Sequence, residues 1–150
     1  MNAFTLLKKD HKTVAGLMDK IEATTERAIK SREELFTELK NELDVHARIE
    51  EAILYPVLEK AEPTHDISLE AYEEHKVVKQ LLSELESEPK DAEEWTAKFT
   101  VLKENVEHHV EEEEGEMFTK ARKVLSEEEL EELGRRLEEA KGKPQTAGAR

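Results

Sequence analysis

The sequence predicts an all-α protein, an up-down-up-down four-helix bundle with a short extra helix near the C-terminus. Ala, Glu, Lys, Leu and Arg dominate the composition, 40% of residues are charged, and the chain has only five Gly and four Pro, which is typical of long helices. Apolar residues also recur at helical spacing in four long segments. A chain of 150 residues suits one domain, which we expect over 1–141, with a disordered tail at 142–150.

Helix boundaries follow from capping residues and prolines. We expect helices over 3–29, 32–60, 67–86, 92–122 and 127–141. Three starts carry the capping-box spacing, in which two side chains satisfy each other's free backbone amides: Ser31 with Glu34, Asp91 with Glu94, and Ser126 with Glu129. Proline lacks an amide donor, so we expect Pro63 and Pro89 to interrupt the helices and Asp66 to cap the helix after Pro63.

Charge and composition exclude several classes of function. The formal net charge of −14 would repel nucleic acid and anionic membrane surfaces, which are bound mainly through clustered Lys and Arg. With no cysteine, the chain has no disulfide, thiolate metal site or cysteine nucleophile. The N-terminus does not resemble a signal peptide, and no apolar run is long enough to span a membrane. We therefore expect a cytoplasmic protein with neither a nucleic-acid nor a membrane partner.

One short pattern occurs twice. His46 precedes Glu50 by four residues in "HARIE", and His109 precedes Glu113 by the same spacing in "HVEEE". Residues four apart lie one above the other on a helix, and both pairs fall within the apolar stripes of their helices. The sequence therefore predicts that two helices turn a histidine and a glutamate toward the core.

Two more histidines complete the repeat. His11 and His75 lie on the apolar faces of the first and third predicted helices, and each precedes its His-x-x-x-Glu pair by nearly the same distance along the chain. The chain thus reads as two similar helical hairpins. Four imidazoles and two carboxylates are expected to converge from four helices.

Buried carboxylates need compensation. An ionised carboxylate in an apolar interior costs several kcal/mol unless it is paired, hydrogen-bonded or bound to a cation. Nitrogen and oxygen donors of this kind suit Fe, Mn or Zn, and helical bundles can hold two-metal carboxylate sites. We predict two metal ions bridged by Glu50 and Glu113. The alternative is a metal-free structural bundle with ordinary buried hydrogen bonds, which the repetition of the pattern disfavours.

These motifs carry a resemblance to a known family. His11, "HARIE" with His46 and Glu50, "EEHK" with His75, and "HHVEEE" with His109 and Glu113 resemble the bacterial hemerythrin-like, or HHE cation-binding, family over about residues 4–141. The resemblance implies a non-haem centre of two Fe ions with these six ligands. It also implies dioxygen, hydrogen peroxide or nitric oxide as small-molecule ligands, with catalase-like peroxide decomposition or the sensing of oxygen, nitric oxide or iron as the function. Metal storage or buffering and a zinc-filled site stay open.

The chain departs from oxygen-carrying hemerythrins in two places. Lys79 stands where those proteins have a second ligand histidine on the third helix, and Glu113 follows His109 by four residues where theirs follows by five. Four histidines leave a metal position open. We therefore expect reactivity with peroxide, and no reversible carriage of oxygen. The ammonium group of Lys79 is expected to reach solvent.

Two tyrosines flank the predicted site. Tyr72 precedes His75 by three residues and faces the same way, so it is a candidate extra ligand, or a hydrogen-bond donor to bound oxygen, with a role in catalysis. The alternative is an aromatic residue of the bundle core. Tyr55 lies about 180° around a regular helix from His46, so we expect it not to reach the metals.

The remaining histidines are expected outside the site. His108 is turned about 100° from His109 on a regular helix, which places it at the surface or behind the ligands. His65 falls in the predicted loop after Pro63 and should be exposed.

Overall fold

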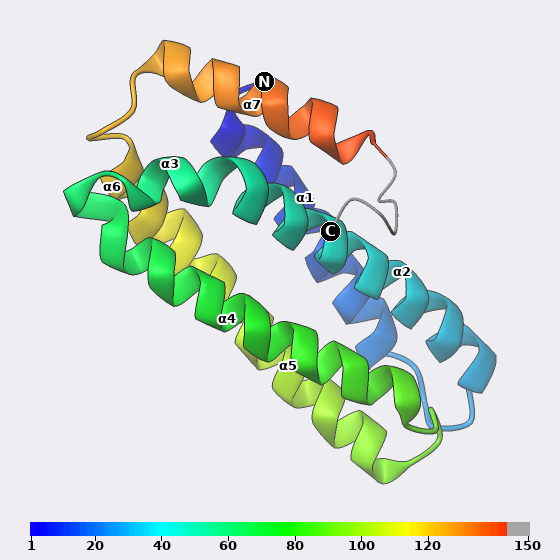
Figure 1. The fold of residues 1–150 in the computed structure, drawn as a ribbon. Coiled ribbons are helices and arrows are strands. Elements are labelled where there is room, and N and C mark those ends of the chain that lie inside the picture. Colours follow the sequence, from blue (N-terminus) through cyan, green and yellow to red (C-terminus); the bar gives the residue numbers. More distant parts are fainter. Residues whose placement is uncertain (144–150) are drawn as a thin grey trace.

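The computed structural model describes residues 1–143, and all regular secondary structure in that part of the chain is helical (Figure 1). The elements are α1 (Ala3–Glu22), α2 (Ile29–Ile49), the π-helical turn η1 (Glu50–Leu54), α3 (Tyr55–Glu59), α4 (Glu62–Ser87), α5 (Glu93–Glu112), the π-helical turn η2 (Glu113–Met117), α6 (Phe118–Ala121) and α7 (Glu127–Lys141). The predicted all-α class is confirmed. The predicted tail at 142–150 lies outside the described residues from residue 144 onward.

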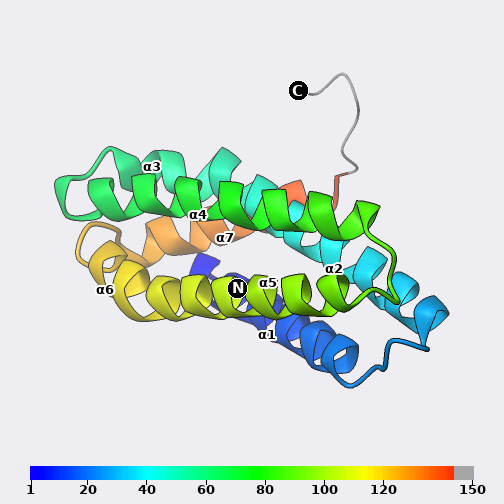
Figure 2. The ribbon, with the colours of Figure 1, turned by 90° about the horizontal axis from the view of Figure 1, so that it is seen from below.

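Two of the long helical segments contain a π-helical turn. η1 joins α2 to α3, and η2 joins α5 to α6, without a break in the helical chain. These two segments lie beside α1 and α4 as long neighbouring rods in both views of the ribbon (Figures 1 and 2). α7 runs along the outside of this group, against α1 and α2. Within residues 1–143, no helix combines the length and apolarity needed to cross a lipid bilayer.

Two of the three predicted capping boxes are not formed. α2 begins at Ile29 after Ala28, which makes no side-chain cap, so Ser31 and Glu34 lie inside the helix. α5 likewise follows Ala92, so the predicted cap at Asp91 is not used. The capping box of Ser126 with Glu129 is present at the start of α7 and confirms that prediction.

Pro63 does not lie between two helices, as expected, but inside the first turn of one. α4 begins at Glu62 and holds Pro63 in its first turn, where the missing amide would have had no helical partner. Asp66 therefore lies inside α4 and does not cap it. Pro89 does fall between helices, after α4 ends at Ser87.

The first helix ends seven residues before the predicted boundary, at Glu22. The Thr24 hydroxyl donates to the Ile21 carbonyl at 2.6 Å and accepts from Nε of the buried Arg32 at 2.8 Å. Arg32 also donates to the Lys90 carbonyl at 2.8 Å. The turn after α1 is thus held by side-chain hydrogen bonds, which compete with continuation of the helix.

The core consists of two apolar clusters. One contains Phe4, Leu54, Phe118 and the leucines of α7, and the other contains Met18, Leu39, Leu82 and Trp95 among its members. In every long helical segment the histidine of the predicted site lies between residues of the two clusters, as His11 does between Leu7 and Val14. A polar layer therefore crosses the middle of an otherwise apolar bundle.

Candidate metal centre

Four histidines converge from four helices as the sequence predicted. His11 of α1 and His46 of α2 have ring centroids 4.9 Å apart, and His75 of α4 and His109 of α5 have theirs 5.0 Å apart. Their side chains are 6–10% exposed. The imidazoles thus form two buried pairs, which we call the α1/α2 pair and the α4/α5 pair.

Two glutamates connect these pairs. Glu50 is 0% exposed, and its Oε1 lies 3.3 Å from His46 Nε2 and 3.2 Å from His75 Nε2. Glu113 is 1% exposed, with Oε1 at 3.1 Å from His11 Nε2 and Oε2 at 3.5 Å from His109 Nε2. Each carboxylate therefore contacts one histidine of each pair.

A second ring of carboxylates surrounds the histidines. Every Nδ1 of the four lies close to an acidic side chain: His11 with Glu114 at 2.6 Å, His46 with Asp10 at 3.0 Å, His75 with Glu51 at 2.6 Å, and His109 with Glu74 at 2.5 Å. A carboxylate at Nδ1 accepts its proton, fixes the ring orientation and leaves Nε2 available as a ligand. This arrangement is the usual support of a metal-binding histidine.

The π-helical turns begin at the two glutamates and change the facing of the residues after them. η1 begins at Glu50 and η2 at Glu113, and the amides of Tyr55 and Phe118 donate to the carbonyls of these glutamates, five residues back. The extra residue per turn shifts all later side chains around the helix axis relative to a regular α-helix. π-helical turns of this kind often occur at functional sites.

Tyr55 reaches the cluster, and the prediction that it would not was wrong. Its hydroxyl donates to Glu113 Oε2 at 2.7 Å or Glu50 Oε1 at 3.0 Å, and it lies 3.3 Å from His75 Nε2. The expected offset of about 180° assumed a regular helix, whereas η1 turns Tyr55 inward. Tyr55 is 0% exposed, and its phenol oxygen is a further candidate donor to a cation.

The charges of the cluster compensate one another in the absence of a cation. Burial opposes the charged imidazole of His46, but Glu50 and Asp10 prevail and hold its pKa well above the usual value. The same balance, with Glu113 and Glu74 as partners, raises the pKa of His109 to about 10. Burial would raise the pKa of Glu50, yet His46 keeps it well below the usual value. A bound cation would replace protons on these imidazoles.

The cluster also holds buried polar atoms without hydrogen-bond partners. Within the described part of the chain, five of the six such side-chain atoms belong to it: His11 Nε2, His46 Nε2, His109 Nε2, Glu50 Oε2 and Glu113 Oε1. An unsatisfied buried polar group costs about 1–3 kcal/mol. The three nitrogens lie close to carboxylate oxygens but are not aligned for hydrogen bonds, so the donor set fits cations placed between them.

The donor atoms divide into two overlapping groups. One contains His11, His46, Glu50 and Glu113, and the other contains Glu50, His75 and His109, with the ligand atoms of each group within 4.8 Å of one another. Glu50 belongs to both. The six residues predicted as ligands are thus the six that the fold brings together here.

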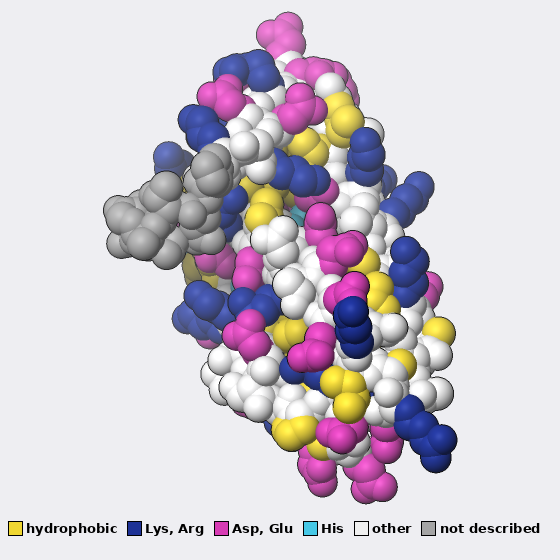
Figure 3. All heavy atoms as spheres, turned by 90° about the vertical axis from the view of Figure 1, so that its right-hand side faces the viewer, with side chains coloured by type: hydrophobic (Ala, Val, Ile, Leu, Met, Phe, Trp, Pro, Cys, Tyr) yellow, Lys and Arg dark blue, Asp and Glu magenta, His cyan; other side chains and the backbone are white. Residues whose placement is uncertain are grey.

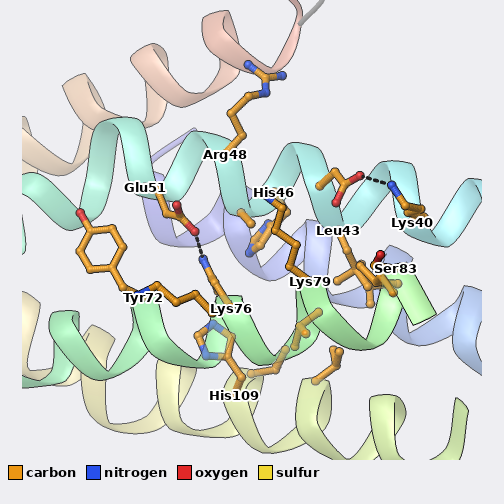
Figure 4. A pocket seen from close by; sticks show the side chains of 18 of the residues that line it. Lys40, Leu43, His46, Arg48, Glu51, Tyr72, Lys76, Lys79, Ser83 and His109 are labelled. Atoms are coloured by element: carbon orange, nitrogen blue, oxygen red, sulfur yellow. Dashed lines mark hydrogen bonds and ion pairs between the residues drawn. The ribbon is translucent and has the colours of Figure 1, made fainter. Parts of the chain in front are cut away.

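Tyr72 lies beside this cluster. Its ring packs edge-on against Tyr55 with centroids 5.4 Å apart, and burial together with the charges of Glu59 and Glu51 raises its pKa. Its hydroxyl points away from His109 in Figure 4. The structure therefore places the hydroxyl of Tyr55, and not that of Tyr72, in hydrogen-bond contact with Glu50 and Glu113.

The other residues singled out in the sequence lie outside the cluster. His108 is 66% exposed and lies 3.1 Å from Glu112 Oε2. His65 is exposed and belongs to the first turns of α4 rather than to a loop. Lys79 is exposed, as expected, at the edge of a groove.

That groove opens between α2 and α4 and has a volume of about 830 Å³. Its lining includes all four histidines of the cluster, with Leu43, Val78 and Leu82 as apolar walls. Figure 4 shows the side chains of Lys79 and His46 between α2 and α4, with His109 on the side of α5. On the face shown in Figure 3, histidine surface is visible only as a small patch among acidic, basic and apolar side chains. The four histidines therefore line the groove, while the two glutamates of the cluster are buried beneath it.

Fold and site together define a helical-bundle protein whose core contains a candidate cation-binding cluster of histidine and glutamate. The model of the hemerythrin HHE cation-binding domain matches residues 2–121, and the chain belongs to this family. A solved structure of a hemerythrin HHE cation-binding domain-containing protein from Mycobacterium kansasii is similar, with a TM-score of 0.81 and 33% identity over 95% of this chain and 88% of that one.

Similar sequences include proteins of different length. An uncharacterized protein of Mycobacterium tuberculosis is 34% identical over 152 residues, which covers 96% of this chain and 90% of the relative. A Nostoc protein described as a DNA nickase is 28% identical over 145 residues, but the match covers only 40% of it.

Proposed function

We propose that this chain holds two iron ions at the cluster and that the loaded centre reacts with hydrogen peroxide or dioxygen. The observation that carries the proposal is the position of Glu50 and Glu113, each in contact with one histidine of both pairs. Two carboxylates in such positions can be shared by two cations. Imidazole and carboxylate donors suit iron, and bundles of this kind are known to hold two-iron carboxylate sites.

The protein ligands would leave room for a small molecule. Each ion would have two imidazoles and a share of Glu50, which belongs to both donor groups. Glu113 contacts one histidine of each pair, and the Tyr55 oxygen lies beside both glutamates. When bound, the iron would supply Lewis-acid and redox chemistry at an oxygen atom of the substrate. The groove between α2 and α4 supports access for dioxygen, peroxide or nitric oxide.

The residues around the ions have separate tasks. The four outer carboxylates hold the Nδ1 protons and so orient the imidazoles. The Tyr55 hydroxyl holds a proton between the two glutamates. The apolar clusters on both sides of the polar layer limit the entry of bulk water, which strengthens electrostatic interactions inside the site.

The chain's use of peroxide can be tested directly. Protein expressed in iron-replete medium is analysed for metal content and visible absorption, and dioxygen release after addition of hydrogen peroxide is followed with an oxygen electrode. We expect close to two irons per chain and release of dioxygen, because disproportionation of peroxide to dioxygen and water needs no other reductant. Metal-free protein is the control. Protein that binds no metal would refute the proposal, and an iron-loaded protein inert to peroxide and dioxygen would leave only storage or structure.

A further inference from the structure

One of the four outer carboxylates differs from the others. The side chain of Asp10 is 4% exposed, whereas those of Glu114, Glu51 and Glu74 are 35%, 41% and 29% exposed. Water can reach the three glutamates and compensate the carboxylate oxygen that is not used by the histidine. Asp10 has no such access, so its second oxygen needs a partner from the protein.

That partner is Lys141, in the last turn of α7. Its ammonium group contacts Asp10 Oδ1, while Asp10 Oδ2 faces Nδ1 of His46 at 3.0 Å. Nε2 of the same imidazole faces Glu50 at 3.3 Å. The Asp10 carboxylate thus lies between the ammonium group of Lys141 and the imidazole of His46. A continuous line of contacts runs from α7 to the proposed metal centre.

α7 is built so that Lys141 arrives at Asp10. The capping box at Ser126 fixes its start, and Leu130, Leu133 and Leu137 are buried in the core. Where the helix crosses the N-terminus, Gly134 lies so close to the Met1 carbonyl that an added Cβ atom would overlap that oxygen.

α1 and α7 contact each other at two points with equal spacing along both helices. Gly134 of α7 contacts the backbone of Met1–Ala3, and Lys141 of α7 contacts Asp10 of α1. Asp10 is seven residues after Ala3, and Lys141 is seven residues after Gly134. Seven residues advance a helix by about 10.5 Å. The contact at Gly134 therefore sets the register that brings Lys141 over Asp10.

We propose that Lys141 is a positioning residue of the metal centre, which acts through Asp10 on His46. This inference rests on the proposed metal centre. It goes beyond the family's domain, because the family model ends at residue 121 and α7 lies after it. Lys141 holds the buried carboxylate in place. Asp10 in turn holds the Nδ1 proton of His46 and leaves Nε2 directed at the cation.

The inference predicts an effect on one ion more than on the other. His46 belongs to the donor group of the α1/α2 pair, whereas His75 and His109 belong to the second group. Loss of the Lys141 charge should therefore weaken the ion beside His11 and His46 and leave the ion beside His75 and His109 bound. A general loss of stability would affect both ions alike.

The experiment is an anaerobic titration of Fe(II) against a competing chelator, on the wild type and on Lys141→Met, Lys141→Arg, Asp10→Asn and Lys143→Met. Partners behind a ligating histidine are worth about 10–100-fold in metal affinity. We expect Asp10→Asn to fall in that range and Lys141→Met to weaken one ion by roughly 10-fold, at its lower end. Lys141→Arg should restore binding, and Lys143→Met should match the wild type, because Lys143 is 70% exposed and pairs only with Glu139 in the described chain.

Two further measurements separate positioning from stability. Mössbauer spectra of the iron-loaded proteins distinguish the two iron environments, and Lys141→Met should alter one of them. Combining Lys141→Met with Asp10→Asn should weaken the ion no more than Asp10→Asn alone, because the two residues act in series. Chemical unfolding of the metal-free variants records any loss of fold.

Several outcomes would overturn the inference. If Lys141→Met bound both ions with wild-type affinity, the inference would be wrong and the proposed metal centre would stand. The same holds if Lys141→Met lost both ions equally, in proportion to a lower stability of the metal-free protein. Equal effects of Lys143→Met and Lys141→Met would point to net charge alone. A wild-type chain that binds no iron would refute the proposed function together with this inference.

Discussion

The hydroxyl of Tyr55 lies 2.7 Å from Oε2 of Glu113, a residue of the opposite hairpin. It reaches Glu50 as well, at 3.0 Å. Phe118 occupies the matching position after Glu113, but it stacks on Phe4 with ring centroids 4.1 Å apart and has no hydroxyl to offer. Each hairpin contributes two histidines and one glutamate to the cluster, but at the position five residues after the glutamate only the first hairpin has a tyrosine.

Tyr55→Phe should therefore change the centre in both its metal-free and its loaded state. Without the hydroxyl, two buried carboxylates lose their shared donor, and an unsatisfied buried group costs about 1–3 kcal/mol. We expect the metal-free variant to unfold at a lower denaturant concentration and the ferric protein to show an altered visible spectrum. Tyr72→Phe is the matched control, and an effect of Tyr72→Phe larger than that of Tyr55→Phe would contradict the assignment.

The position of Tyr55 was missed because the sequence was interpreted with a regular helical repeat. One extra residue in a turn changes the facing of every later side chain. Two residues could have indicated the change. Pro56 follows Tyr55 and cannot donate a backbone hydrogen bond, and Gly115 lies inside the second turn, where the backbone is least restricted. Interruptions of helical hydrogen bonding usually occur at such residues.

The six histidine and glutamate positions could be predicted because each lies in a regular α-helix or is the first residue of a π-helical turn. Up to Glu50 and Glu113 the helices are regular, so the four-residue spacing from His46 and His109 placed the pairs correctly. The outer carboxylates could not be predicted in the same way. Contacts such as that between His109 and Glu74 join different helices. They depend on how each helix is rotated about its axis relative to its neighbours, which the spacing of residues within one helix does not determine.

Single ligand substitutions should lower the metal content of the purified protein. His46→Ala and Glu113→Ala each remove a donor from the cluster, and we expect both to lose at least one ion. His65→Ala is the control because its side chain is exposed, lies outside the cluster and hydrogen-bonds with the carbonyl of Glu59. Metal analysis that gave the same content for all three variants would rule out this set of ligands.

The adjacent histidines of α5 test the register of that helix. His109 contacts Glu113 and Glu74, whereas His108 is 66% exposed and contacts Glu112. His109→Ala should reduce metal binding strongly, and His108→Ala should leave it unchanged. Equilibrium dialysis against Fe(II) measures both, and the reverse order would mean that the helix is turned by one residue.

The metal-free protein should lose stability as the pH rises from neutral. The pKa of His109 is about 10 in the folded chain against a usual value of 6.5, and the pKa values of His11, His46 and His75 are raised too. A raised pKa means that the folded state binds protons more tightly than the unfolded state. The stabilisation is complete below about pH 6.5 and is lost as the pH approaches 10.

Metal should reverse this trend, because cations bind the deprotonated imidazoles. The increase in melting temperature caused by iron should therefore grow between pH 6 and pH 8. Thermal unfolding of the metal-free and loaded protein across that range measures both effects. A metal-free protein that became more stable with rising pH would show that the histidines are not protonated in the folded state.

Gly134→Ala should detach α7 from the N-terminus. A Cβ at this position would overlap the Met1 carbonyl oxygen and lie 2.7 Å from the Asn2 backbone, and neither is a flexible side chain that can move aside. Overpacking of this kind costs about 1–3 kcal/mol. Gly16→Ala is the control, because nothing lies within 4 Å of its added Cβ; there the better helix former should stabilise α1 by up to about 1 kcal/mol. The denaturant concentration at which the metal-free protein unfolds should fall for Gly134→Ala and rise for Gly16→Ala. Equal shifts of this midpoint in the two variants would show that α7 is free to adjust its position.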